Sequence, residues 1–251
     1  MNKLACSLSA GILLIAASPS QAQETPVSLS MVTYYHCAQG DAPRADAIVK
    51  EHVVPFLKAE QAAGRITAYG WSEHVEGGEW RRLLRTAGTA IDKLIDSRDG
   101  LTKTMQAPEH VKAFEEFARI CPTHEDYIWR VKSSSQSAAD AGRMRPPYAM
   151  STYYECDANE AESDAITASA FAPVLTQRVK DGAIASWTWM EHLFGGRYRR
   201  ILVIDGKDEK SLLANWATLQ DELQKAAPDM SRRFSAICHS HADYIWKLDV
   251  Q

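Results

Sequence analysis

Two segments of the sequence combine tryptophan, glutamate, histidine and arginine at matching spacing. The first is GRITAYGWSEHVEGGEWRRLL (64–84) and the second is GAIASWTWMEHLFGGRYRRIL (182–202). In each, a Gly-Gly pair separates two runs with strand-like alternation, which predicts a β-hairpin with a two-residue turn. Because turn length fixes register, Glu73 should face Arg82 across the first hairpin.

The face of the hairpin that carries Glu73 and Arg82 is the first candidate site. Alternation along a strand adds Trp71 to this face. The second hairpin presents the same set, with one further tryptophan: Trp187, Trp189, Glu191 and Arg200. An aromatic surface with few convergent polar groups is typical of a small-molecule site. The glutamates could act as bases and the arginines could hold an anionic or enolate oxygen. The alternative is a structural ion pair that tolerates burial.

The opposite face of each hairpin carries a second, weaker candidate. There His74 should lie beside Arg81, and His192 beside Arg199. The nearby positive charge predicts a lowered histidine pKa and a neutral imidazole at neutral pH. These histidines would be the axial ligands if the protein bound haem, whereas a solvated hairpin tip is the alternative without function.

The similarity of the two segments extends over nearly the whole chain. With a shift of about 118 residues, TYYHC (33–37) matches TYYEC (152–156), and DAI (46–48) matches DAI (164–166). The pattern of each copy predicts strand, helix, strand, strand, helix, strand. In the first copy the strands are expected at 29–37, 66–75, 79–87 and 126–132. The helices are expected at 44–63, with a kink at Pro55, and at 90–105, followed by a further helix from Pro108. This order predicts an α+β fold of two ferredoxin-like βαββαβ repeats.

The element order and the W-x-E-H-x-x-G-G-x-x-R-R hairpin resemble the dimeric α/β-barrel superfamily. The resemblance implies that the two repeats pair with each other, sheet to sheet, as one pseudo-symmetric barrel. Each repeat would then cover the apolar sheet face that the other leaves exposed. The superfamily includes cofactor-free oxygenases, polyketide cyclases, haem-handling enzymes and proteins without known activity, so the resemblance implies a fold rather than a reaction.

Four cysteines occupy matching positions in the repeats, in part through CPTHEDYIW (121–129) and CHSHADYIW (238–246). The first and fourth strands of a ferredoxin-like unit are antiparallel neighbours, which predicts two disulfides: Cys37–Cys121 and Cys156–Cys238. The alternative is zinc, bound in each repeat by two thiolates and an imidazole, His124 or His241. We expect these histidines to form local hydrogen bonds instead, with Asp126 and Asp243 either as their partners or as caps of nearby backbone amides.

The N-terminus and the composition indicate an exported protein. Lys3, an apolar run and small residues before position 23 are typical of a signal peptide spanning 1–22. The repeats then occupy 27–132 and 149–251, joined by a linker at 133–148. The net charge of −4 among 251 residues provides no basic patch for nucleic acid, and the longest apolar run is too short to span a membrane.

These features together predict a periplasmic or secreted protein that binds a small aromatic or apolar molecule inside the barrel. It could transform that molecule by proton transfer without a cofactor or metal, since no phosphate loop, dinucleotide fingerprint or zinc-protease helix is present. A non-catalytic structural or partner-binding protein, and a haem-binding protein, are the alternatives.

Overall fold

The computed structural model describes residues 28–136, 145–157 and 159–251. The first repeat comprises β1 (Leu29–His36), α1 (Ala42–Ile48), the π-helical turn η1 (Val49–Val53), α2 (Val54–Ala62), β2 (Ala68–Gly77), β3 (Arg82–Gly88), α3 (Ile91–Met105), α4 (Val111–Ile120) and β4 (Thr123–Ser134). The second comprises β5 (Tyr148–Glu155), α5 (Glu160–Ile166), η3 (Thr167–Phe171), α6 (Ala172–Lys180), β6 (Ser186–Phe194), β7 (Arg200–Gly206), α7 (Glu209–Ala226), α8 (Pro228–Ile237) and β8 (Ser240–Val250). The segment predicted to be a signal peptide (1–22) and the middle of the predicted linker (137–144) lie outside the described residues.

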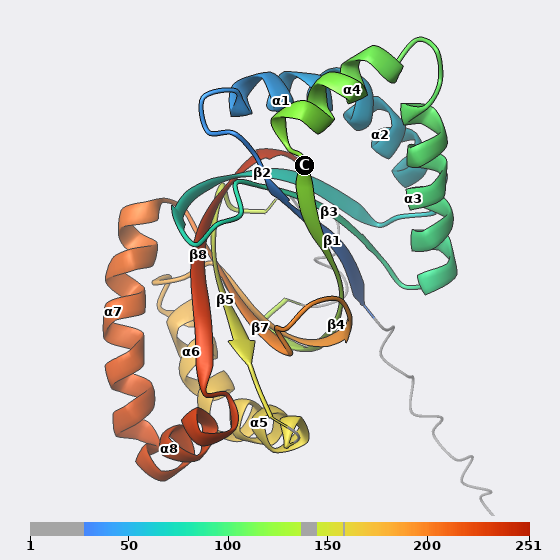
Figure 1. Ribbon diagram of the computed structural model, residues 1–251. Coiled ribbons are helices and arrows are strands. Elements are labelled where there is room, and N and C mark those ends of the chain that lie inside the picture. The colour runs from blue at the N-terminus through green and yellow to red at the C-terminus, as the bar shows by residue number, and fades with distance from the viewer. Residues whose placement is uncertain (1–27, 137–144, 158) are drawn as a thin grey trace, which may run out of the picture.

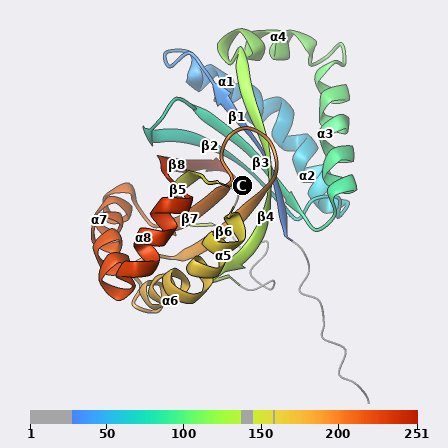
Figure 2. The ribbon, with the colours of Figure 1, turned by 60° about the horizontal axis from the view of Figure 1, so that its bottom comes forward.

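The strands form one closed antiparallel barrel in the order β1-β3-β2-β8-β5-β7-β6-β4. Within each repeat the first strand lies between the third and the fourth. The repeats join at two seams, where β2 pairs with β8 and β4 pairs with β6. The helices of the two repeats cover opposite sides of the barrel (Figures 1 and 2). The predicted fold class is confirmed, with backbone pairing at both seams in addition to the contact between sheets.

Both faces of the sheet are buried, one inside the barrel and one under helices. Adjacent tyrosines show the alternation: Tyr34 lies in the interior cluster, whereas Tyr35 packs against the helical side with Trp71. The interior is filled by aromatic rings, none more than 4% exposed: Tyr34, Trp80, Tyr127, Trp129, Tyr153, Tyr198, Tyr244 and Trp246. The expectation of a ligand-sized cavity inside the barrel, lined by Trp71 and Trp189, is therefore wrong. These two indoles belong to the cores beneath the helices.

The hairpins have the predicted register, with Glu73 opposite Arg82 and Glu191 opposite Arg200. The residues between Gly77 and Arg82 leave the regular strand, however, and Trp80 consequently lies in the barrel interior, on the other side from Trp71. A Cβ on Gly77, whose φ is +114°, would lie 2.0 Å from the carbonyl oxygen of Asp243. Glycine is required because each turn rests directly on the fourth strand of the other repeat.

The cysteines form the two predicted disulfides. Cys37 is bonded to Cys121, and Cys156 to Cys238, each joining the end of a repeat's first strand to the approach of its fourth. The zinc alternative needed free thiolates, and in this structure the sulfurs are bonded to each other. At the predicted kink, the structure has a π-helical turn, η1, that ends two residues before Pro55.

Among the described residues, no helix has the length and apolar character to cross a membrane.

Candidate functional site

The four predicted catalytic residues do not pair with one another as Glu73–Arg82 and Glu191–Arg200; among the described residues each has another charged partner. In the first repeat, Arg82 instead donates two hydrogen bonds to Asp46 of α1, at 2.6 and 2.8 Å. The indole nitrogen of Trp71 donates to the same carboxylate at 2.8 Å. Glu73 accepts a hydrogen bond from Lys247 at 2.7 Å, across the seam between the repeats.

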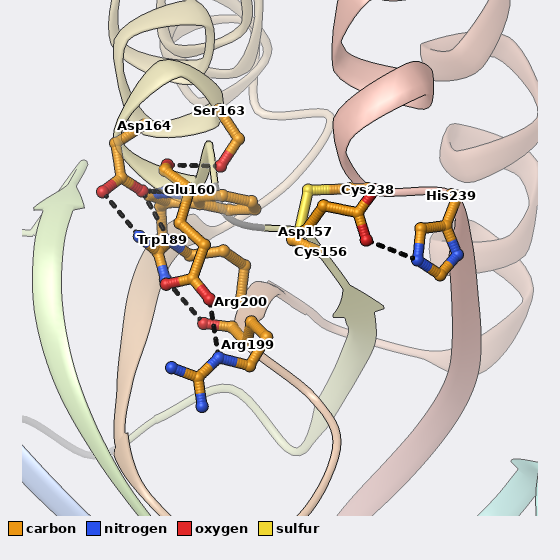
Figure 3. The surroundings of a disulfide bond; sticks show 10 residues. All are labelled: Cys156, Asp157, Glu160, Ser163, Asp164, Trp189, Arg199, Arg200, Cys238 and His239. Carbon is orange, nitrogen blue, oxygen red and sulfur yellow. Dashed lines mark hydrogen bonds and ion pairs between the residues drawn. A yellow bond between two sulfur atoms is a disulfide. The ribbon is translucent and has the colours of Figure 1, made fainter.

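The second repeat reproduces this arrangement. Arg200 donates to Asp164 at 2.7 and 2.9 Å, and Trp189 donates to Asp164 at 2.8 Å. Figure 3 shows these three side chains together near the Cys156–Cys238 disulfide. Glu191 lies against Arg130 and Lys132 of β4. The hairpin arginines and tryptophans therefore fasten the first helix of each repeat to the sheet.

The aspartates in this tie were not predicted as partners, although the repeated DAI triplet contained the signal. The hydrophobic pattern could not say which sheet face meets the helices, because both faces are buried. The carboxylates that bind Arg82 and Arg200 are Asp46 of α1 and Asp164 of α5, rather than the glutamates of the hairpins. Burial alone would lower the pKa of Arg200, but Asp164 and Glu160 outweigh it and the pKa is raised.

The histidines of the opposite face point into the filled barrel. The pKa of His74 and that of His192 are both lowered, first by burial and then by Arg81 or Arg199. The direction agrees with the sequence prediction, but the larger cause is burial, so a solvated hairpin tip is not what the structure shows. Their Nε2 atoms are buried and have no partner within the described part of the chain.

A cavity of about 470 Å³ lies elsewhere, between the outer sheet face and the helices of the second repeat. Trp189, Tyr154 and Leu202 contribute from the sheet. The helices η3, α6, α7 and α8 and the start of β8 supply the remaining lining residues: Thr167, Phe171, Leu175, Trp216, Gln220, Leu223, Gln224, Ser231, Arg232, Phe234, Ser235, Cys238 and His241. This is the size range of ligand pockets. Trp187, the third predicted aromatic, donates to Thr176 on α6 and is not part of the lining.

The corresponding space in the first repeat is filled by a phenylalanine. Phe114 stands seven residues before Cys121, and Ser231 stands seven residues before Cys238, so the two occupy equivalent places in α4 and α8. Phe114 is buried and packs against Phe117 and His52. A serine is much smaller than a phenylalanine, so this difference contributes to the space beneath the helices of the second repeat.

A second difference makes this cavity more polar. Thr167 lies about 118 residues after Val49, at the start of the matching π-helical turn. Thr167 is 1% exposed, and its hydroxyl has no hydrogen-bond partner among the described residues. A buried hydroxyl without a partner is costly, and ligands commonly satisfy such groups.

An oriented histidine completes the cavity wall. His241 Nε2 lies 3.4 Å from Asp243 Oδ2, and Thr152 donates to the other oxygen of Asp243 at 2.7 Å. The first repeat has the same arrangement in His124, Asp126 and Thr33. The predicted pairing of each histidine with its aspartate agrees with these distances. With a proton on Nε2 facing the carboxylate, Nδ1 of His241 is the nitrogen that can accept a proton.

A wider groove of about 820 Å³ between α6 and α7 is a poorer candidate. Its buried cation, Arg178, already donates to Glu222, Asn215 and Thr218. The buried guanidinium of this groove is therefore already paired within the protein.

The comparisons with known proteins identify the fold. No protein-family model matches the sequence, and no curated protein matches it. Solved structures do: an anthrone oxidase-like protein is 14% identical, over 90% of this chain and 93% of that one, with a TM-score of 0.55. A mutant chlorite dismutase from Candidatus Nitrospira defluvii is 11% identical, over 90% and 92%, with a TM-score of 0.53.

These likenesses and the closed barrel define the class: the protein is a dimeric α/β barrel built as a tandem duplication within one chain. At such low identity the neighbours show the fold alone.

Proposed function

We propose that this protein binds a small, planar, mainly apolar molecule that carries at least one hydrogen-bonding group, in the cavity of the second repeat. The observation that carries the proposal is the difference between the repeats: Ser231 opens the space that Phe114 fills, and Thr167 adds a hydroxyl where Val49 is apolar. The anthrone oxidase-like neighbour supports a fused-ring aromatic ligand as the first one to test.

The lining fits such a ligand in shape and polarity. Trp189, Trp216, Tyr154 and Phe234 provide flat apolar surfaces, against which aromatic rings pack favourably. Burial, and then the charge of Asp243, raises the pKa of Tyr154, so this phenol stays neutral and can donate a hydrogen bond.

Binding can be tested with anthrone as the probe and tryptophan fluorescence as the signal, because Trp189 and Trp216 both line the cavity. Thr167→Val should weaken binding by about five- to tenfold, the value of one hydrogen bond. Val49→Thr, the reciprocal change in the first repeat, is the matched control and should leave binding unchanged. Failure of anthrone to quench the fluorescence in a saturable manner would contradict this ligand class.

His241 favours a catalytic extension of the same proposal, proton transfer. Nδ1 would take a proton from an acidic carbon of the bound molecule, leaving an enolate, and would return a proton to it. Asp243 would hold the imidazole and stabilise its charged form. Deuterium exchange into the methylene group of anthrone in D₂O, followed by NMR, measures this step directly. His241→Gln should lose the catalysed exchange, whereas His124→Gln should retain it; equal exchange rates in both variants would refute the extension.

Haem is the competing ligand, and the side chains in place do not fit it. His74 and His192 face an interior filled by rings, which leaves no room for a macrocycle. The imidazole that lines the cavity, His241, has its Nε2 turned toward Asp243. Titration with haemin should therefore give no Soret band of a histidine-ligated iron, and such a band would contradict the proposed ligand.

We further propose that the protein acts in the periplasm or outside the cell. The two disulfides support an oxidising compartment, and the sequence of residues 1–22 supports export. N-terminal sequencing of the protein recovered from producing cells should begin at Gln23; retention of Met1 would exclude cleavage at this position.

A further inference from the structure

The cavity of the second repeat has an apolar interior and a polar entrance. Its deep lining is buried and mainly apolar, and solvent hardly reaches Leu175 and Trp189 there. The exposed lining residues are all polar or charged, and they come from α7, α8 and the start of β8: Gln220, Gln224, Arg232, Ser235 and His241. A ligand that matches this gradient has an apolar body inside the cavity and a polar group at its opening.

The entrance favours an acceptor of hydrogen bonds, and in particular a negatively charged one. Within the described part of the chain, no aspartate or glutamate lines this cavity. The entrance side chains that α7 and α8 contribute all have N–H or O–H groups that can donate. One of them, Arg232, carries a permanent positive charge. Charged donors and acceptors form the stronger hydrogen bonds, so a ligand carboxylate fits this set better than a neutral oxygen does.

Arg232 has a weak partner within the protein. Among the described residues, its charged partner is Asp229, one turn earlier in α8, and the two side chains are 68% and 88% exposed. An ion pair with this exposure contributes little to stability, so the guanidinium can also bind the carboxylate of a ligand. The next residue, Arg233, differs, because Glu162 of α5 accepts two hydrogen bonds from its guanidinium, at 2.6 and 2.7 Å.

The first repeat has an acidic residue at the place of Arg232. Glu115 and Arg232 both stand six residues before the second cysteine of their disulfide. At the following position the charge is reversed too, but there the partner on the first helix reverses with it, so an ion pair is kept in both repeats. Arg232 is therefore a further difference at the cavity, beside Ser231 and Thr167, and it brings a positive charge to the entrance.

We propose that the ligand of this cavity is an aromatic carboxylic acid, whose carboxylate lies at the entrance between α7 and α8 and is bound by Arg232. The aromatic rings extend inward from there, toward Trp189 and Thr167. This inference rests on the proposed function and names the ligand class more closely, because it adds an anionic group to the planar apolar molecule. A guanidinium and a carboxylate can pair through two parallel hydrogen bonds, so Arg232 also determines which end of the ligand enters first.

The test compares anthraquinone-2-carboxylate with anthraquinone-2-carboxamide, two planar compounds of nearly equal size that differ in charge. Each is titrated into the protein at neutral pH, with tryptophan quenching as the signal. At low ionic strength the carboxylate should bind about fivefold more tightly, the upper range for a solvent-accessible ion pair. This preference should decrease in about 1 M NaCl, where salt screens charges over about 3 Å. A preference that salt does not change would contradict a charge contact.

Substitutions at two adjacent arginines identify the residue responsible. Arg232→Met should bring the two affinities close to each other, and Arg232→Glu, which introduces the charge of Glu115, should favour the carboxamide. Arg233→Met is the matched control, because it removes the same charge from a position that does not line the cavity, and it should keep the preference. Equal affinities of the two compounds for the wild type, or an equal loss of preference in both methionine variants, would overturn the inference.

The failure of this inference and the failure of the proposed function give different results. If anthrone quenches the fluorescence in a saturable manner and the carboxylate has no advantage over the carboxamide, only the anionic group is refuted. If neither anthrone nor either anthraquinone binds, the proposed function fails and this inference fails with it. The comparison of the two anthraquinones in the wild type needs no variant, so it decides the matter even where a variant does not fold.

Discussion

Filling the cavity with the side chain that the first repeat already has at this place should abolish binding without unfolding the protein. Ser231→Phe introduces a ring into a space of about 470 Å³. Burial of the ring should contribute about 1.5–3 kcal/mol, and loss of the hydrogen bond from Ser231 to the Leu223 carbonyl, 3.1 Å in length, should cost about 1 kcal/mol. The net gain is about 0.5–2 kcal/mol, which corresponds to a rise in Tm of about 1–8 °C for a domain of this size.

The assay pairs thermal unfolding with the fluorescence titration on the same samples. Ala236→Phe is the matched control, because it adds the same ring to an exposed position of α8. The control should bind anthrone with unchanged affinity and show no gain in Tm. If Ser231→Phe is stable and binds with unchanged affinity, the ligand does not occupy this cavity and the reasoning from the repeat difference fails.

Four further predictions concern stability and its dependence on pH. Asp164→Asn should lower the free energy of unfolding by about 3–5 kcal/mol in denaturant titrations, because Arg200 is 3% exposed and would lose its main partner. Glu73→Gln, which removes the half-exposed ion pair with Lys247, should cost less than about 1 kcal/mol. Equal effects would show that the Asp164–Arg200 pair is not more important for stability than the Glu73–Lys247 pair. Gly77→Ala should lower the Tm strongly and Gly40→Ala should not, since a Cβ meets the Asp243 carbonyl at the first and nothing within 4 Å at the second. Replacing Cys37 and Cys121 by serine should cost about 4–5 kcal/mol for a loop of 84 residues, read from denaturant unfolding. The folded-state pKa values of His74 and His192 lie below the usual 6.5, so the unfolded chain takes up protons first as the pH falls, and stability present above about pH 6.5 is lost on acidification. The double variant with glutamine at both positions should therefore lose less free energy of unfolding between about pH 7.5 and about pH 5.5. An equal loss in the variant and the wild type would show that other groups cause the decline.

The parts of the fold that depend on local or topological rules were predictable from the sequence. The Gly-Gly turn determined which residues of the hairpin face each other, and the strand order determined which cysteines meet. Both rules act through the backbone and need no knowledge of what covers the sheet. The hairpin register and both disulfides were accordingly found where they were expected.

The direction of the hairpin side chains was not predictable in the same way. A sheet that is buried on both faces has apolar residues on both, so its pattern does not distinguish the barrel interior from the helical side. Trp71 and Trp246 are equally buried, yet one lies under helices and the other lies inside the barrel. The residues that define the cavity required another comparison, between unequal positions of the two repeats such as Phe114 and Ser231.

The covalent link between the repeats has a consequence for how the two halves tolerate change. In a barrel assembled from two identical chains, any substitution that opens a cavity opens it twice, and the loss of packing is doubled. In a single chain the halves can specialise: the first preserves stability while the second accepts a packing defect that can serve a ligand. A saturation mutagenesis library scored separately for folding and for binding should therefore give unequal profiles at equivalent positions, with large residues favoured at Phe114 by the folding score alone and small residues favoured at Ser231 by the binding score alone.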